Sequence, residues 1–203
     1  KKEIGIYPIA SSGHSLGEYS SLVAGGALTL EEAIPLVHMR GKLMQEAVPE
    51  GMGKMAAILG LEDAQVEALC IEASSAEAQV SPANYNAPMQ VVVSGHATAV
   101  DKIQTLAEKV IPLKVSAPFH CSLMKPVADA FHAYLHSVEW KKLTFPIANN
   151  VDGILRTDAF NYHFLETQID HPVRWTTCMK NLETLSPSYF IEMGPGKVLT
   201  GLA

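Results

Sequence analysis

The chain has little cysteine and no long apolar run. Its 203 residues include three cysteines, Cys70, Cys121 and Cys178, which lie far apart without CxxC spacing. An odd number of separated cysteines predicts neither a disulfide framework nor a structural zinc site, and it favours a reducing, cytoplasmic compartment. No segment approaches the roughly 18 apolar residues that cross a bilayer, and no signal-peptide core follows Lys1–Glu3, so we expect no membrane partner.

Positive charge is also scarce. The 15 lysine and arginine residues stand against 21 aspartate and glutamate residues, which gives a formal net charge of -6. A nucleic-acid surface needs an excess of basic residues, so we expect no DNA or RNA partner. Hydrophobic residues make up 48% of the chain, enough for a substantial core, and this composition predicts a globular protein.

The most informative local signal is the pentapeptide Gly-His-Ser-Leu-Gly at 13–17. It fits a sharp strand-to-helix turn that presents the Ser15 hydroxyl as a nucleophile, with an apolar stretch at 4–12 before it and a helical pattern at 16–24 after it. The flanking glycines would allow a strained backbone and close approach of strand and helix. The N–H of Leu16 would then face an oxyanion. A glycine-rich loop with an incidental serine remains the alternative.

The middle of the chain predicts a separate subdomain. A capping-box pattern at 29–32 first opens a helix that should run to about Ala47, in which Pro35 predicts a kink or a late start. From residue 52 to 116 the apolar pattern changes to β-α-β-β-α-β, the order of a ferredoxin-like unit. Its elements are expected at 53–59, 63–74, 79–84, 90–94, 97–109 and 111–116.

The remaining segments predict an α/β unit. Helices are expected at 122–137, 160–168 and 173–185, and strands near Ile147 and at 189–192. This alternation of helices and short apolar strands predicts a mostly parallel sheet. Ser15 and His120 would meet at its edge.

Several separated motifs together resemble one family. They are Gly-His-Ser-Leu-Gly-Glu-Tyr at 13–19, Met-Arg-Gly-Lys at 39–42, Gln-Glu-Ala-Val-Pro at 45–49, Val-Ser-Ala-Pro-Phe-His-Cys at 115–121, Leu-Met-Lys-Pro at 123–126, Asn-Asn-Val-Asp at 149–152 and Gly-Pro-Gly-Lys-Val-Leu at 194–199. In this order, over nearly the whole chain, they resemble the malonyl-CoA:acyl carrier protein transacylases of fatty acid synthesis. The resemblance implies an α/β-hydrolase-like catalytic subdomain at 1–51 and 117–203, whose N-terminal part is expected to be missing, and a ferredoxin-like insert at 52–116.

The resemblance also implies a catalytic set. Ser15 would be the nucleophile, and His120 the base that takes its proton and later activates the incoming thiol. The backbone carbonyl of Gln168 would hold the imidazole in place of the usual aspartate. If a true acid serves instead, the candidates are Asp152, Asp158 and Asp170.

The substrate contacts follow in the same way. Arg40 would bind the free carboxylate of a malonyl group through two parallel charge-assisted hydrogen bonds and so select malonyl over acetyl. Phe119 would wall the acyl pocket, and Asn86 would contact substrate. A transacylase of this kind needs no bound cofactor, so none is expected. No metal is expected either, because His132 and His136 have the spacing of a HExxH helix but Ala133 stands where its glutamate would be.

Two features depart from the family pattern. Its members carry a Gly-Gln-Gly-Ser-Gln loop that supplies a second oxyanion donor, and nothing before Gly13 matches this loop, so we expect the chain to supply only the Leu16 donor. Met89 stands where glycine is common, which puts the local turn in doubt.

The expected activity is transfer of malonyl from malonyl-CoA to the phosphopantetheine thiol of acyl carrier protein through a malonyl-serine intermediate. A serine esterase or thioesterase, and a non-catalytic module that binds the acyl group or the carrier protein, remain as alternatives.

Overall fold

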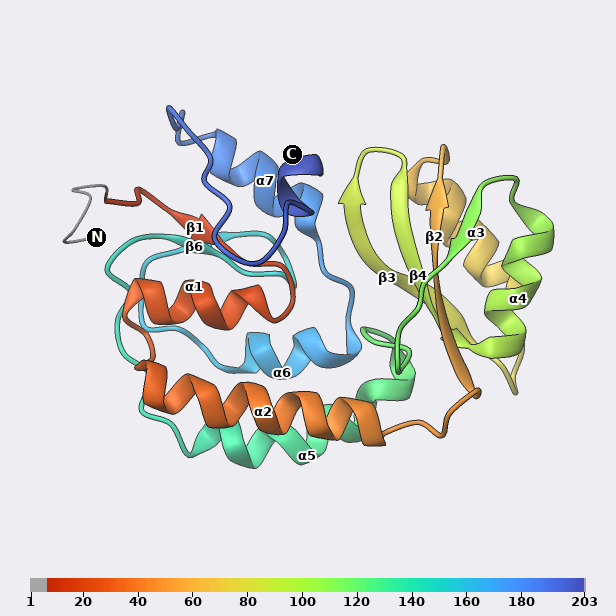
Figure 1. Ribbon diagram of the computed structural model, residues 1–203, viewed down its shortest axis with the longest axis horizontal. Helices are drawn as coiled ribbons and strands as arrows, with labels where there is room; N and C mark the ends of the chain where they lie inside the picture. The colour runs from red at the N-terminus through yellow and green to blue at the C-terminus, as the bar shows by residue number, and fades with distance from the viewer. Residues whose placement is uncertain (1–6, 203) are drawn as a thin grey trace.

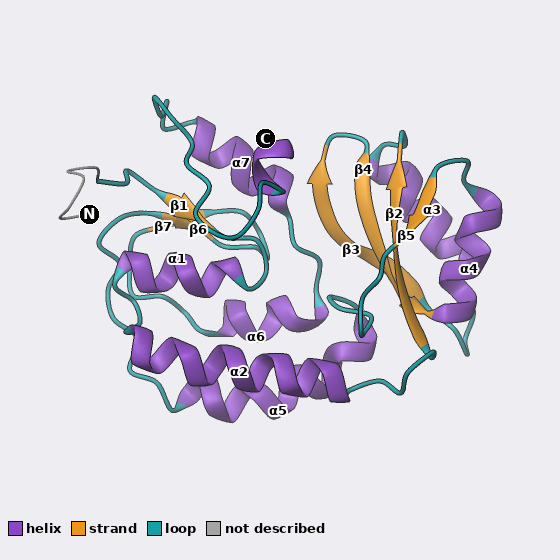
Figure 2. Ribbon diagram, viewed as in Figure 1, coloured by secondary structure: helices purple, strands orange, loops and turns teal. Residues whose placement is uncertain are grey.

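The computed structural model describes residues 7–202, which form a mixed α/β fold of two units (Figure 1). The larger unit contains β1 (Ser11–Ser12), α1 (Gly17–Gly25), α2 (Leu30–Glu46), α5 (Lys125–His136), β6 (Ile147–Ala148), β7 (Leu155–Arg156), α6 (His163–Asp170), α7 (Trp175–Glu183) and short 3₁₀ turns at Ser122–Met124 and Leu199–Gly201. The smaller unit contains β2 (Gly53–Leu59), α3 (Asp63–Ala73), β3 (Val80–Ala87), β4 (Gln90–His96), α4 (Ala97–Leu106) and β5 (Val110–Pro112). Figure 2 shows helices dominating the larger unit and the long strands gathered in the smaller one.

The smaller unit has the predicted β-α-β-β-α-β order of elements. Its sheet is four-stranded, with the order β3-β4-β2-β5 and every pair antiparallel. Helices α3 and α4 cover one face of the sheet, where Val66, Val100 and Ile103 are fully buried against the strands. Helix α4 ends at Leu106, earlier than the predicted 109, because Ala107 is already extended with φ -122 and ψ 142.

The predicted mostly parallel sheet of the larger unit is wrong. The sheet has three strands in the order β1-β6-β7, and only β1 and β6 run parallel within the described chain, whereas β6 and β7 are antiparallel. Residues 149–154 turn the chain back immediately after β6, so β7 follows as a short return strand that carries no strong apolar pattern. The alternation of helices and apolar segments in the sequence therefore did not predict which strands pair or in which direction.

Other elements differ in their limits. Residues 189–192 have no strand partner in the described chain, and of the predicted strand at 4–12 only Ser11–Ser12 is a strand, with residues 4–6 outside the described part. The late start predicted for α2 is wrong, since the helix begins at Leu30 with Pro35 inside it. The capping box explains this start: the Glu32 N–H donates to Thr29 Oγ1 (3.2 Å) and the Thr29 N–H donates to Glu32 Oε2 (2.7 Å).

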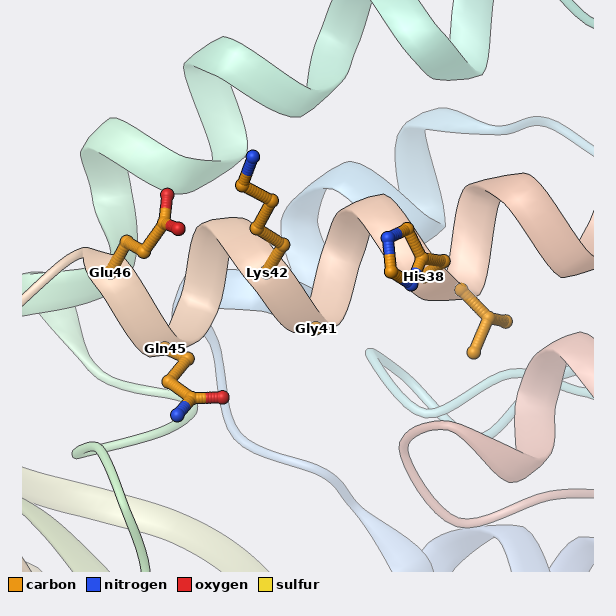
Figure 3. A pocket seen from close by; sticks show the side chains of 6 residues that line it. His38, Gly41, Lys42, Gln45 and Glu46 are labelled. Carbon is orange, nitrogen blue, oxygen red and sulfur yellow. The ribbon is translucent and has the colours of Figure 1, made fainter.

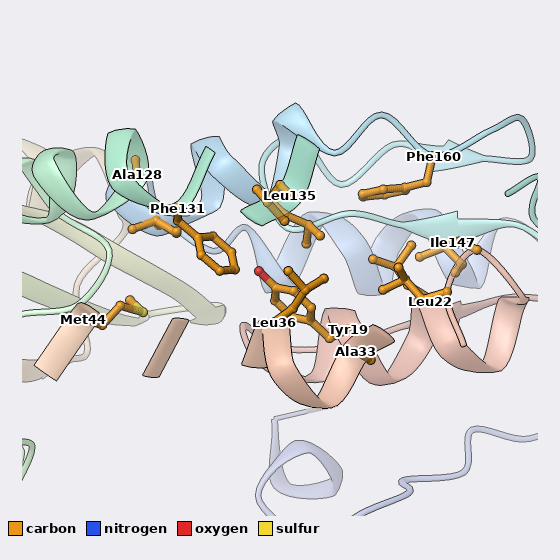
Figure 4. Packing of buried hydrophobic residues seen from close by; sticks show 14 of the residues in the cluster. Tyr19, Leu22, Ala33, Leu36, Met44, Ala128, Phe131, Leu135, Ile147 and Phe160 are labelled. Atoms are coloured by element: carbon orange, nitrogen blue, oxygen red, sulfur yellow. The ribbon is translucent and has the colours of Figure 1, made fainter. Parts of the chain in front are cut away.

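The hydrophobic core of the larger unit fixes the elements that carry the candidate site. Figure 4 shows Leu22 of α1, Leu36 of α2, Phe131 and Leu135 of α5 and Ile147 of β6 packed together, and all five are buried. Full burial of such a side chain contributes about 1.5–3 kcal/mol each to folding. The start of α1, the middle of α2 and the segment before α5 are therefore held in fixed positions. Among residues 7–202, no helix has both the length and the apolar character that a bilayer-spanning segment needs.

The turn between β3 and β4 contains the family departure at Met89. Met89 has φ +59, in the left-handed region that glycine adopts freely and other residues adopt at a cost of about 1–2 kcal/mol. Pro88 precedes it, and its ring fixes φ near the value that the first central position of a tight turn needs. The hairpin therefore forms with a strained, half-exposed methionine at its tip.

Candidate active site

The pentapeptide at 13–17 forms a tight turn between β1 and α1. Ser15 has φ +52, a strained conformation for a residue with a side chain, and Gly17 begins the helix. Gly13 is buried, and a Cβ atom there would lie 1.9 Å from the backbone carbonyl carbon of Gly17, so only glycine permits this approach. A Cβ at Gly17 would meet nothing within 4 Å in the described chain, so only the first of the two flanking glycines is sterically required.

Gly13→Ala is expected to destabilise the protein by about 3 kcal/mol or more, because the new methyl group cannot fit against the backbone of the α1 start. Thermal or denaturant unfolding measures this loss. Gly41→Ala is the matched control, since a Cβ at that exposed position of α2 meets nothing within 4 Å. The control should gain about 0.5–1 kcal/mol from its better helix propensity. Equal stability of wild type and Gly13→Ala would contradict the steric argument.

Ser15 and His120 lie within hydrogen-bond distance. Ser15 Oγ is 2.8 Å from His120 Nε2, and His120 Nδ1 is 2.7 Å from the backbone carbonyl oxygen of Gln168. A carbonyl oxygen only accepts, so Nδ1 carries the proton and Nε2 of the neutral ring presents a lone pair to the serine O–H. Burial and the nearby Arg40 guanidinium lower the pKa of His120 to about 3, so the ring is neutral at physiological pH. His120, like Ser15, has a positive φ, at +60.

The three alternative acids do not contact this imidazole in the described chain. Asp152 binds Arg156, with Oδ2 2.6 Å from Nη2, and Asp170 accepts a hydrogen bond from His171. Asp158 contributes a backbone carbonyl oxygen, 3.5 Å from the Leu143 nitrogen. The Gln168 carbonyl is the group at His120 Nδ1.

The Arg40 side chain extends from α2 to Ser15 and Gln168. It continues the buried stripe of that helix and is only 5% exposed, and its Nη2 donates to Ser15 Oγ and to Gln168 Oε1, both at 2.9 Å. An arginine has five N–H donors, so these two bonds leave others available for an anionic ligand. Nε is buried and has no partner among residues 7–202. A fixed positive charge beside the serine oxygen favours negative charge on that oxygen or on a group attached to it.

A buried network that sequence reasoning missed holds the turn in place. Asn150 accepts from the Ser15 N–H at Oδ1 (2.6 Å) and donates from Nδ2 to the Gly13 carbonyl (2.8 Å), so one side chain fixes both sides of His14. Glu18 Oε2 accepts from the Asn150 N–H (3.1 Å) and from Gln168 Nε2 (2.7 Å). Burial raises the pKa of Glu18 to about 8. Glu18 and Asn150 both lie in motifs that carry the family resemblance, and this position in the motifs is the sequence feature that could have pointed to them.

The other predicted residues lie around this group. Leu16 follows the serine, and its N–H has no acceptor within the described chain, as an oxyanion donor requires. Asn86 accepts a hydrogen bond from His14 at 2.8 Å, and both line an open cavity whose other lining residues lie between Glu192 and Leu202. Phe119 is partly buried and packs both against the core of the larger unit and against buried strand residues of the smaller unit.

A second hollow in the surface is unrelated to this group. It runs along α2 and is lined by Val37, His38, Gly41, Lys42, Gln45 and Glu46 (Figure 3). Neither Ser15 nor His120 lines it, and Arg40 points to the opposite, buried side of the helix. We therefore assign no chemistry to it.

Several known proteins are similar to this chain. Residues 2–201 match the family model described as the acyl transferase domain. The malonyl CoA-acyl carrier protein transacylase of Salmonella typhimurium is 46% identical over 205 residues, which cover 98% of this chain and 66% of that protein. The crystal structure of FabD from Acinetobacter baumannii superposes with a TM-score of 0.95 at 44% identity, covering 99% of this chain and 66% of that one.

A third relative was solved with a partner. The structure of a type II PKS acyl-carrier protein in complex with its malonyl-transacylase matches with a TM-score of 0.92 at 42% identity, covering 99% of this chain and 67% of that chain. This chain thus spans 66% of the Salmonella relative. The similarity confirms the resemblance seen in the motifs, and the chain belongs to the acyl transferase domain family.

Proposed function

We propose that the protein transfers a malonyl group from malonyl-CoA to the phosphopantetheine thiol of an acyl carrier protein in fatty acid biosynthesis. The observation that carries this proposal is the 2.8 Å contact between Ser15 Oγ and the unprotonated Nε2 of His120, beside a buried arginine. Relatives named as malonyl CoA-acyl carrier protein transacylases support the choice of donor and acceptor. The complex of a relative with its carrier protein supports direct docking of such a partner.

In the first half-reaction, Ser15 Oγ attacks the thioester carbonyl of malonyl-CoA while His120 Nε2 takes its proton. The carbonyl oxygen becomes an oxyanion that accepts a hydrogen bond from the Leu16 N–H. Collapse of this intermediate breaks the C–S bond, and the protonated His120 returns the proton to the departing CoA sulfur. Gln168 keeps the ring in the productive tautomer throughout, because its carbonyl holds the Nδ1 proton.

The second half-reaction reverses these roles. The carrier-protein thiol gives its proton to His120 Nε2 and its sulfur attacks the malonyl-serine carbonyl. The ester C–O bond breaks, and Ser15 Oγ regains the proton from His120. No bound cofactor enters either step.

Arg40 gives the reaction its preference for malonyl. The negative malonyl carboxylate pairs with a guanidinium that is already held by Gln168 and desolvated by burial, so binding requires little reorganisation. An acetyl group offers no charge to this cation. Asn86 and Phe119 would contact the pantetheine arm and the acyl group from the side of the smaller unit.

The fold would consist of a catalytic subdomain and an inserted subdomain. Residues 1–51 and 117–203 would form an α/β-hydrolase-like catalytic subdomain, and residues 52–116 a ferredoxin-like insert. The strand order β3-β4-β2-β5 and the two helices on one face support the second assignment.

A covalent intermediate is the expected result when the protein, at its natural length, is mixed with malonyl-CoA. Intact-mass spectrometry should show a gain of one malonyl group on wild type and none on Ser15→Ala, which lacks the nucleophilic oxygen. Addition of holo acyl carrier protein should remove the group from the serine and place it on the carrier.

Two outcomes would contradict this proposal. Free malonate without malonyl-carrier product would show a hydrolase, in which water instead of a thiol takes the acyl group. A folded protein that forms no adduct but still binds the carrier would show a binding module.

A further inference from the structure

A cluster of two histidines and a glutamate lies on the packed helices α5 and α6, outside the candidate active site. His132 Nδ1 is 2.9 Å and His163 Nδ1 is 3.0 Å from the same oxygen, Oε2 of Glu166. The three potential ligand atoms all lie within 4.8 Å of one another. The sequence pairs His132 with His136 by spacing, whereas the structure joins it to two residues on another helix.

The distances suit a metal ion. Zinc bonds of about 2.0–2.2 Å to imidazole nitrogen and carboxylate oxygen place neighbouring ligand atoms of a tetrahedral centre about 3.3 Å apart. The observed N···O separations of 2.9 and 3.0 Å need to widen by a few tenths of an ångström, and the two Nδ1 atoms, which lie within 4.8 Å of each other, must come to the same spacing. Each imidazole must move its Nδ1 proton to Nε2 or release it, which leaves a lone pair directed at the ion.

The ligands are also held in place before any ion arrives. Tyr162 packs edge-on to the His132 ring at 5.9 Å and against the His163 ring at 4.5 Å, while the Trp140 ring stacks on Tyr162 at 6.2 Å. Glu166 Oε2 is the oxygen that both imidazoles contact, so it lies between the two rings. The Glu166 side chain is 20% exposed, so the carboxylate is partly shielded from water yet open to an ion.

We propose that His132, His163 and Glu166 bind a divalent transition-metal ion of the zinc class, which links α5 to α6. Two imidazole nitrogens and one carboxylate oxygen suit zinc, nickel or copper far better than magnesium or calcium, which prefer oxygen ligands. Three protein ligands leave at least one coordination position for water. The ion would connect the helix that follows His120 to the helix that carries Gln168, so it would stabilise the frame of the site without touching the reacting atoms.

Isothermal titration of the metal-free protein with zinc chloride tests this site. We expect one ion per chain, and little heat from magnesium chloride. His163→Ala and Glu166→Gln should each weaken zinc binding by more than about 100-fold. Loss of a residue that only orients a ligand costs roughly 10- to 100-fold in metal affinity. Glu166→Gln preserves size and a hydrogen-bond acceptor, so it should remain folded. Zinc should also raise the melting temperature of wild type and leave that of Glu166→Gln unchanged.

His136→Ala is the matched control. Its ring lies 6.1 Å from that of His132 on the same helix, but it is outside the cluster. Its zinc affinity should equal that of wild type. The proposal is overturned if wild type takes up no zinc, if the His163 and Glu166 variants bind it as tightly as wild type, or if His136→Ala loses as much affinity as they do.

Discussion

His120→Ala is expected to lower kcat/KM for malonyl transfer by about 10⁴-fold, the upper range for loss of a general base. The substitution removes the imidazole nitrogen 2.8 Å from Ser15 Oγ that takes the serine proton. The measurement is the rate of malonyl-carrier formation at saturating carrier protein. His171→Ala is the control, because this exposed histidine pairs with Asp170 and should keep the wild-type rate.

The pH dependence of the wild type gives a second measurement of the same residue. Burial and the Arg40 charge lower the pKa of His120 from 6.5 to about 3, so Nε2 keeps its lone pair well below pH 6.5. The midpoint of the acid-side decrease in kcat/KM should therefore lie well below pH 6.5. Because the folded state binds this proton more weakly than the unfolded state, folding stability also decreases as pH falls from 6.5 towards 3. A limb centred at 6.5 that disappears in His120→Ala would contradict the buried, neutral imidazole.

Arg40→Ala is expected to slow malonyl transfer by about 10²- to 4 × 10³-fold, equivalent to roughly 3–5 kcal/mol, because the substrate carboxylate would lose its buried partner. The variant also loses the bond to Ser15 Oγ, so acetyl transfer should fall as well, but by less. The diagnostic quantity is therefore the ratio of malonyl to acetyl transfer, measured with both CoA thioesters.

Arg40→Lys separates charge from shape. Lysine keeps the positive charge but presents a single ammonium in place of the planar guanidinium, so it should recover only part of the ratio. Circular dichroism must show that both variants are folded, since the substitution leaves Gln168 Oε1 without its donor. An unchanged ratio in Arg40→Ala would remove this residue from acyl selection.

Secondary structure was predicted correctly where it depends on residues close together in the sequence. The capping box at 29–32 and the limits of β2 agree with the structure, because each depends on residues a few positions apart. Within residues 7–202, the strand predicted at 189–192 has no partner, and apolar residues alone do not make a strand without one. The sequence predicted no strand at β7, because this two-residue strand exists only through its antiparallel pairing with β6 after the turn at 149–154.

Sequence alone determined the turn around Ser15, the order of elements in the smaller unit and the family. These three features follow from glycine sterics, apolar periodicity and the order of the motifs, which can all be read directly from the amino-acid sequence. Only the tertiary structure decided that Arg40 is buried against the serine oxygen, that Asn150 clamps both sides of His14, and that His132 faces Glu166. Those partners lie on different elements, and the hydrophobic core brings the elements together through packing that no short stretch of residues encodes.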